Sequence, residues 1–252
     1  MNNEFEQLIK EYKNPSLDYN PALMWFWNGD ISEEGITYQL ERFREKNIVN
    51  FFIHSTNAMH VEYLSDRYFE LIKHAVKEAK RLGMKYWIYD ELDWPSGMAG
   101  GLLREKYPEC EQKEIYGQKE CYDLYGHRTI INRRGEFLCA QRIIKKQGKY
   151  FVTDVTDLCE VSYDGKSVTV QYQSKSFLKE EVVFFFSQHS DRVIYATLGR
   201  KTSKGLRGYV NVLREETIAK FIKMTHEKYK EAIGDEFGKT VMGVFTDEPT
   251  TL

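Results

Sequence analysis

The sequence predicts the α/β fold class: parallel strands and covering helices, interrupted by an inserted antiparallel β domain. Between residues 22 and 101, apolar runs of strand length alternate with stretches whose apolar residues recur at helical spacing, and this alternation returns after residue 206. Between them, short β-rich segments follow one another with turn residues in between. We therefore divide the chain into a first α/β part (1–111), an inserted β domain (112–205) and a continuation of the α/β part (206–252).

Three strands and two helices are predicted in the first part. The strands are the apolar runs ALMWFWN (22–28), IVNFFIH (48–54) and MKYWIYDE (84–91). Ser32, followed by two glutamates, begins one helix, and Ser65 caps a second helix that ends at Gly83. Strands that are apolar on both faces and separated by amphipathic helices are typical of a parallel sheet covered by helices.

The insertion and the segments after it follow from the same signals. Asp164-Gly165, between SY and KSVTV, is the strongest hairpin signal in the chain. After the insertion, YVNVL (209–213) is of strand length, REETIAKFIKMTHEKYKEAIG (214–234) predicts one helix, and KTVMGVFTDEP (239–249) predicts a strand that ends in acids.

Composition excludes several classes of protein. The chain has 252 residues, with 36 Lys and Arg against 38 Asp and Glu, and this formal charge of −2 gives no field that would attract nucleic acid or an anionic membrane. No stretch approaches the roughly 20 apolar residues of a membrane span, and no signal peptide is visible, so we expect a cytoplasmic protein. The four cysteines are widely spaced without a CxxC pair, which argues against a zinc ribbon or a redox motif.

Polar and aromatic residues stand where the predicted strands end. They are Trp27 and Asn28 after the first strand, His54 and Asn57 after the second, Asp90, Glu91, Asp93 and Trp94 after the third, and Asp247 and Glu248 after the last. The carboxyl ends of parallel strands meet at one edge, where ligands of α/β proteins bind. Carboxylates beside aromatic rings suit sugar chemistry, because one acid protonates the leaving oxygen, another activates water, and the rings stack on the sugar. We therefore expect a carbohydrate substrate.

The glycines of WPSGMAGG (94–101) admit a second hypothesis, which is phosphate binding. The segment does not match GxGxxG and lacks the GK[ST] ending of a P-loop. Acids immediately before it would also repel a phosphate. The sequence therefore disfavours a nucleotide site.

Four segments together resemble a known enzyme family. They are PALMWFWNGDIS, HVEYLSDRYFELIKHAVKEAKRLGMKYWIYDELDWPSGMAGG, YVNVLREETIAKFIKMTHEKY and VMGVFTDEP. In this order they look like the amino-terminal catalytic region of bacterial glycoside hydrolases similar to the α-L-rhamnosidases of glycoside hydrolase family 106. The resemblance implies a partial (β/α)8 TIM-type barrel with an inserted β domain, and inverting hydrolysis by two carboxylates, with calcium as an assisting cofactor. It covers residues 22–107 and 207–250.

Carried over by position, the resemblance implies roles for the acids. Glu248 matches the catalytic acid, with Asp247 as support or as a contact to sugar hydroxyls. Asp90 and Glu91 match the strand-end acids before WPSG and would hold hydroxyls or a cation. Because neighbouring residues of a strand point to opposite faces, Asp247 and Glu248 do not form the catalytic pair together, and Asp90, Glu91 and Asp93 are the other candidates for its second member. The metal ligands stay unknown.

Each assignment has a structural alternative. Glu248 precedes a proline, as an acid at a helix N-terminus often does, and there it would stabilise the helix dipole. Asp90 and Glu91 are alternatively members of a structural ion-pair network with lysine or arginine. Trp27 shares a strand face with Trp25 in a predicted core, and His54 at a strand end suits an orienting residue better than a base. Trp94, in a loop beside glycines, is the ring we expect to be exposed.

The predicted function keeps three alternatives open. They are a glycosidase, a non-catalytic carbohydrate-binding fragment, and a structural module of the same fold. The chain stops four residues after Glu248, so we expect a truncated barrel that hydrolyses α-L-rhamnosides weakly or not at all, and that self-associates through its unpaired edges.

Overall fold

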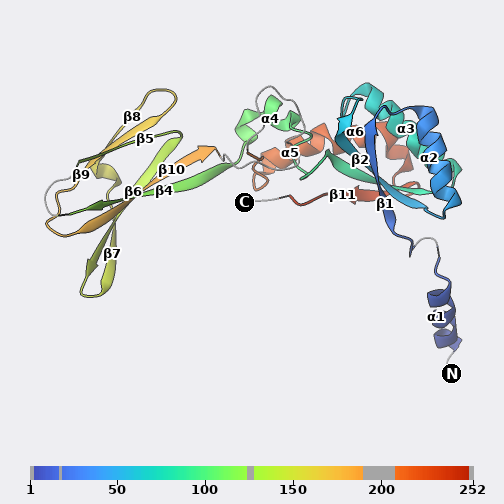
Figure 1. The fold of residues 1–252 in the computed structure, drawn as a ribbon, viewed down its shortest axis with the longest axis horizontal. Coiled ribbons are helices and arrows are strands. Elements are labelled where there is room, and N and C mark those ends of the chain that lie inside the picture. The colour runs from blue at the N-terminus through green and yellow to red at the C-terminus, as the bar shows by residue number, and fades with distance from the viewer. Residues whose placement is uncertain (1–2, 17–18, 124–127, 190–207, 250–252) are drawn as a thin grey trace. The chain divides into compact units, whose positions relative to one another are not determined.

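The computed structural model describes residues 3–16, 19–123, 128–189 and 208–249. The chain divides into two compact units (Figure 1). Unit 1 comprises Met1–Cys110 and Val193–Leu252, and unit 2 comprises Glu111–Arg192. The insertion predicted over 112–205 therefore lies in unit 2 as far as it is described, whereas its last part falls outside the described residues.

Unit 1 contains a parallel sheet. Its strands are β1 (Ala22–Gly29), β2 (Asn50–Met59), β3 (Lys85–Leu92) and β11 (Val241–Phe245), in the order β1-β2-β3-β11. All three pairings are parallel, with Phe26 opposite His54 and Ile53 opposite Ile88. The parallel sheet is confirmed, but in the described residues it is an open sheet of four strands and not the closed barrel, which needs eight.

Helices connect and accompany these strands. They are α1 (Asn3–Lys13), α2 (Glu33–Glu45), α3 (Asp66–Arg81), α4 (Leu102–Lys106), α5 (Glu215–Met224) and α6 (His226–Ile233), with short 3-10 turns η2 (Pro108–Cys110) and η5 (Gly234–Glu236). The predicted caps are confirmed, since Ser32 accepts a hydrogen bond from the amide of Gly35 and Ser65 from that of Tyr68. No helix in the described part of the chain is both long and apolar enough to cross a membrane.

Two predictions after the insertion are wrong. The single helix expected over 214–234 is interrupted at Thr225, whose hydroxyl is buried and donates to the carbonyl oxygen of Phe221 at 2.8 Å. Residues 209–213 form no strand; Tyr209 and Val210 are instead buried against the core of unit 1. At Thr225 a local side-chain hydrogen bond overrides the pattern of apolar residues, and at 209–213 burial against the tertiary core does so.

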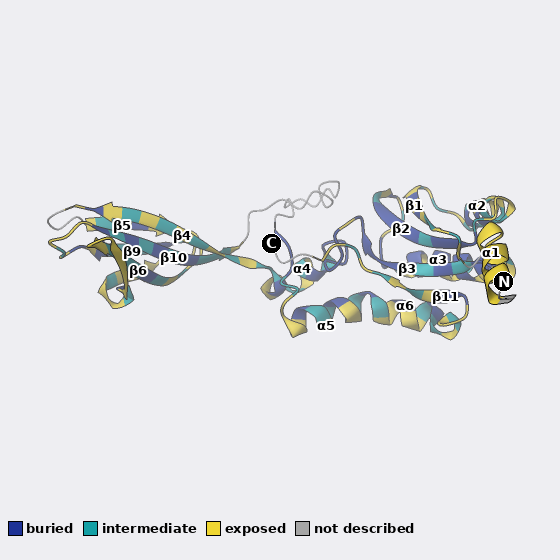
Figure 2. Cartoon of the chain, turned by 90° about the horizontal axis from the view of Figure 1, so that it is seen from below, coloured by how far each residue is buried: buried dark blue, intermediate teal, exposed yellow. Residues whose placement is uncertain are grey.

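A core lies between the sheet and the helices, and Figure 2 shows buried residues along β1, β2 and β3. Phe51, Ile53 and Ser55 of β2 alternate toward this core, as a strand with one helix-covered face requires. At its centre the hydroxyl of Tyr68 lies 2.9 Å from that of Ser55 and 2.7 Å from that of Tyr229. Tyr68 therefore joins β2, α3 and α6.

Unit 2 is antiparallel throughout its described strands. They are β4 (Lys113–Tyr122), β5 (Arg128–Arg133), β6 (Glu136–Lys146), β7 (Lys149–Asp154), β8 (Cys159–Tyr163), β9 (Val168–Gln173) and β10 (Glu180–His189), with the 3-10 turn η3 (Thr156–Leu158). They form two sheets, β4-β10-β6-β7 and β5-β9-β8, around a small core that includes Tyr172 and Phe184. The turn predicted at Asp164-Gly165 is confirmed: Gly165 has a φ of 86°, and the amide of Asp164 donates to the carbonyl oxygen of Ser167.

We predict that Tyr68→Phe destabilises unit 1 by about 1–2 kcal/mol, because it leaves the buried hydroxyls of Ser55 and Tyr229 without their shared partner. Urea denaturation measures the loss. Tyr38→Phe is the matched control, since Tyr38 is exposed on α2. Equal stability of the Tyr68 variant and the wild type would contradict this role.

Candidate functional site at the carboxyl edge of the parallel sheet

The carboxyl ends of β3 and β11 lie side by side, as the sequence predicts. The hydroxyl of Thr246 donates to Asp90 Oδ2 at 2.7 Å, and the hydroxyl of Tyr89 lies 3.1 Å from Asp247 Oδ2. Burial raises the pKa of Tyr89, so its hydroxyl keeps its one proton, which has two acceptors: the carbonyl oxygen of Asp93 at 2.6 Å and the more distant Asp247. The acids after both strands thus belong to one edge of the sheet.

Glu91 is wrapped by the glycine-rich loop that follows it. Its carboxylate accepts hydrogen bonds from the amides of Leu92 (2.9 Å), Gly97 (3.0 Å), Met98 (2.8 Å), Ala99 (2.9 Å) and Gly100. Gly97 has a φ of 122°, and a Cβ there would lie 2.8 Å from the hydroxyl oxygen of Tyr209, so the position requires glycine. The glycines therefore let backbone amides converge on this protein carboxylate.

This arrangement corrects the prediction that Glu91 is catalytic. Its side chain is 1% exposed, and its oxygens already accept five amide hydrogen bonds. Burial raises the pKa of Glu91 to about 7, and the amides act in the opposite direction because they favour the ionised carboxylate. Glu91 therefore holds the loop, and its oxygens are already committed to backbone amides.

Asp90 is likewise committed to the protein, which corrects its assignment as a sugar contact. Its carboxylate accepts from Ser96 Oγ at 2.6 Å and from Thr246, and it lies 3.4 Å from Nε2 of His226. Ser96 in turn accepts from the amide of Asp247 at 2.9 Å and donates its own amide to the carbonyl oxygen of Asp247. The pair Asp90 and Ser96 therefore fixes the backbone of Asp247.

Ser96, Tyr209 and His226 were not identified as site residues from the sequence. Tyr209 donates its hydroxyl to the carbonyl oxygen of Ser96, and His226 reaches Asp90 from the start of α6. Ser96 lies in the quoted WPSG motif, which is the one signal that could have revealed it. The other two come from segments distant in sequence, and no local pattern marks them.

The ends of β1, β2 and β3 are tied by a second set of polar contacts. Asp93 accepts from the backbone amide of Asn57 at 3.2 Å and from its side-chain amide. The hydroxyl of Thr56 lies 2.5 Å from Asn28 Oδ1 and 2.9 Å from the carbonyl oxygen of Trp27. Asn28, Asn57 and Asp93 therefore stand at the predicted edge, where they also bind one another or neighbouring strands.

His54 lies within a cluster of aromatic rings. Its ring centroid is 4.3 Å from that of Tyr89, 4.7 Å from that of Phe26 and 5.5 Å from that of Trp94. The side chain is 1% exposed, and neither ring nitrogen has a hydrogen-bond partner within the described residues. Burial lowers the pKa of His54 to about 4, against the opposing effect of Asp247, so the ring is neutral at pH 7.

The two predicted tryptophans differ in exposure. Trp94 is 44% exposed, which confirms the prediction that its ring is accessible. Trp27 is 1% exposed and packs edge-on against Trp25 and Tyr68 on the helix-covered face, so its ring cannot stack on a ligand. Trp27 is therefore a core residue, because side chains alternate along β1.

Asp247 and Glu248 differ as well. Asp247 is half-buried and held by Tyr89 and Ser96, whereas Glu248 is exposed, has a φ of 42°, and makes no hydrogen bond or ion pair within the described residues. Together with Trp94, these acids form the accessible part of the edge. We call Trp94, His54, Asp247 and Glu248 the edge cluster.

The edge does not fit the calcium that the sequence resemblance implies. Calcium takes six to eight oxygen ligands. The oxygens of Asp90 and Glu91 are occupied by protein donors, and within the described ranges no group of three or more His, Cys, Asp or Glu side chains is arranged to hold a metal ion.

Comparison with known proteins identifies the fold. No protein-family model and no curated sequence matches the chain. Among solved structures, it is similar to a rhamnosidase from Novosphingobium sp. PP1Y, with a TM-score of 0.53 and 11% sequence identity; the match covers 95% of this chain and 39% of that chain. The chain has a rhamnosidase-like fold. It spans well under half the length of that rhamnosidase, and an identity this low shows the fold alone.

We predict that His54 makes unit 1 less stable on acidification. Its pKa is about 4 in the folded state and 6.5 in the unfolded state, so the stability contributed by the neutral ring is complete above pH 6.5 and is lost as pH falls through 4. Because the raised pKa of Glu91 acts in the opposite direction in this range, the wild type is compared with His54→Phe. As pH falls from 6.5 to 4, the free energy of unfolding of the wild type should decrease relative to that of His54→Phe. A constant difference between the two proteins would show that His54 keeps an ordinary pKa.

Proposed function

We propose that the edge cluster binds a sugar and that the chain contributes to a glycoside hydrolase site of the α-L-rhamnosidase type. The observation that carries the proposal is the position of Asp247. The residue is half-buried, its carboxylate lies 3.1 Å from the hydroxyl of Tyr89, its backbone is held by Ser96, and it acts electrostatically on His54, whose ring packs against Trp94. The likeness to a rhamnosidase supports the fold on which such a site is built.

The aromatic surface supports sugar binding. Trp94 offers an exposed ring, which can stack on the apolar face of a pyranose, and the buried ring of His54 backs it. The surface ends at acids whose oxygens accept hydrogen bonds from sugar hydroxyls. A ligand placed on Trp94 is therefore close to the segment that carries Asp247 and Glu248.

The two acids would divide the chemistry. Glu248 is proposed as the general acid that protonates the leaving oxygen, with Asp247 orienting a hydroxyl or supporting the charge that develops on the sugar. A general acid needs room to reach the glycosidic oxygen, and Glu248 is exposed. Inversion requires a second carboxylate about 6.5–9.5 Å away to activate water. Asp93, which is bonded to Asn57, is the remaining candidate named from the sequence.

Carbohydrate binding without hydrolysis is the second candidate function. It is favoured by one observation: Asp90 and Glu91, which the sequence offered as catalytic partners, are saturated by protein donors. A cluster with one accessible pair of adjacent acids and an aromatic ring can bind a sugar without cleaving it.

We predict that, in a longer active protein that contains this chain, Glu248→Gln lowers turnover of an aryl α-L-rhamnoside by about 10²–10⁴, because it removes the proton donor and preserves the shape of the side chain. Release of the phenol measures turnover. The control is Glu231→Gln, which changes an exposed glutamate of α6 away from the edge. Unchanged turnover in Glu248→Gln would remove this residue from the mechanism.

The same preparations separate the two candidate functions. If L-rhamnose raises the midpoint of thermal unfolding but no aryl rhamnoside is cleaved, the chain is a binding fragment. Trp94→Ala should abolish that stabilisation in either case. Both candidates would be overturned if the chain showed no cleavage and no stabilisation at any sugar concentration that leaves the control unaffected.

A further inference from the structure

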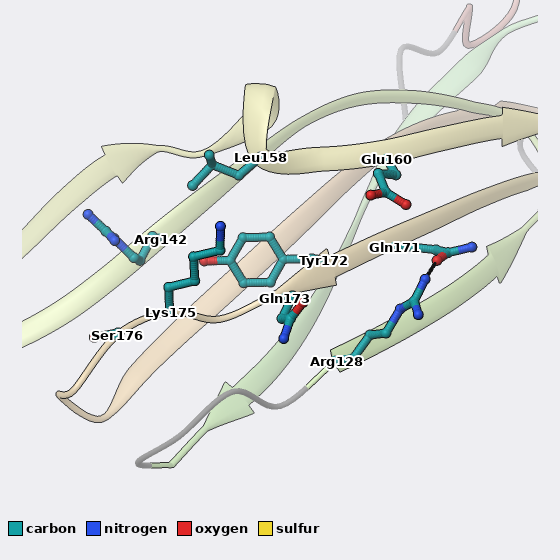
Figure 3. A pocket seen from close by; sticks show the side chains of 9 residues that line it. All are labelled: Arg128, Arg142, Leu158, Glu160, Gln171, Tyr172, Gln173, Lys175 and Ser176. Atoms are coloured by element: carbon teal, nitrogen blue, oxygen red, sulfur yellow. Dashed lines mark hydrogen bonds between the residues drawn. The ribbon is translucent and has the colours of Figure 1, made fainter.

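Unit 2 contains a groove of its own, far in sequence from the edge cluster. Its volume is about 350 Å³, which falls within the range of small-molecule sites. Side chains from β5, β6, β8 and β9, and from the segment that follows β9, line it (Figure 3). The residues on which the argument depends are Arg128, Arg142, Lys175, Glu160, Gln171 and Gln173.

The groove carries more positive than negative charge. Three of its lining side chains are cations and one, Glu160, is a carboxylate. Behind the lining, the buried carboxylate of Glu180 lies 3.9 Å from Nε of Arg142 and compensates it. Among the remaining charges of the lining, Arg128 and Lys175 outnumber Glu160 by one, which leaves one positive charge without a counterpart there. A ligand with a single negative charge balances the groove.

The two outer cations are able to bind such a ligand. Arg128 is held in place by a hydrogen bond from its guanidinium to Gln171 Oε1, which uses one of its five N–H donors. Lys175 is exposed and has no ion pair in the part of unit 2 that the structure describes. In Figure 3 the side chain of Lys175 lies beside the ring of Tyr172, and Arg128 lies on the far side of that ring.

Amide side chains from β9 lie beside Arg128 in the same groove (Figure 3). Gln171 and Gln173 alternate with the buried Tyr172 along β9, so both amides project from the same face of the sheet. Each amide offers donors and an acceptor, which is the combination that neighbouring sugar hydroxyls require. Cations that match one carboxylate and amides that match hydroxyls thus line the same groove.

We propose that this groove is a second binding site, and that it takes a carboxylated sugar, a uronate unit. The carboxylate pairs with the guanidinium of Arg128, Lys175 adds positive charge on the other side of the Tyr172 ring, and the hydroxyls lie on Gln171 and Gln173. The site is independent of the edge cluster: it requires no catalysis, and either proposal can fail without the other.

The test is an NMR titration of the ¹⁵N-labelled 252-residue chain with D-glucuronate. We expect amide shifts confined to the groove, around residues 171–175, with a dissociation constant on the order of 1 mM. D-glucose presents the hydroxyls without the charge, and acetate and sulfate present the charge without the hydroxyls. Each should bind at least about tenfold more weakly, because one half of the recognition is missing.

A pair of double variants assigns the site. Arg128→Gln with Lys175→Gln removes the two outer cations and should weaken glucuronate binding at least about tenfold. Arg134→Gln with Lys166→Gln removes the same charge from exposed positions of unit 2 outside the groove and should leave binding unchanged. Amide spectra away from the groove verify that both variants fold.

Three results would overturn the proposal. Acetate or sulfate binding as tightly as glucuronate would make the groove a simple anion site, and equal binding of glucose would show that the cations play no part. Shifts from glucuronate that persist unchanged in the Arg128 and Lys175 variant, or that are absent in the wild type, would remove the site.

Discussion

The carboxylate of Glu91, enclosed by backbone amides of the loop 97–100, is the contact on which the carboxyl edge depends. A short loop rich in glycine has a high conformational entropy when it is unfolded, so ordering it needs strong local contacts. Glu91 supplies them from the end of β3, where the backbone is already fixed by its neighbours β2 and β11. Burying a carboxylate is costly unless donors surround it, and here they do. These hydrogen bonds to Glu91 therefore fix the conformation of the loop.

An ordered loop in turn places Ser96, and Ser96 places the acids after β11. Its hydroxyl accepts from the amide of Asp247 and donates to Asp90, and its backbone amide donates to the carbonyl oxygen of Asp247, so this one residue fixes two strand ends. The same loop presents Trp94 to solvent beside His54. The buried acids Asp90 and Glu91 therefore act as supports, and the accessible Trp94, Asp247 and Glu248 remain for a ligand. This division explains why two adjacent pairs of acids at one edge have unlike environments.

Much of the fold could be predicted from the sequence because its signals are local. Ser32 and Ser65 cap helices, and Asp164-Gly165 turns a hairpin, through contacts within a few residues. The roles of the acids could not be predicted, because a carboxylate at a strand end has the same sequence pattern whether it faces a sugar or a ring of amides. The position of Trp27 at a strand end suggests a ligand contact, whereas strand alternation with Trp25 favours the core, where the structure places it. Tyr209 and His226 reach the edge through tertiary contacts, which no local pattern records.

Glu91 orders the loop that positions the edge cluster, and amide hydrogen exchange at residues 97–100 measures this ordering. Exchange is compared between the wild type and Glu91→Gln above pH 7, where the carboxylate is ionised. We predict slow exchange of these four amides in the wild type and about tenfold or greater acceleration in the variant. The reason is that the NH2 group of glutamine is a donor and cannot accept the backbone N–H hydrogen bonds that a carboxylate oxygen accepts. Unprotected amides in the wild type, or equal protection in both proteins, would show that Glu91 does not order the loop.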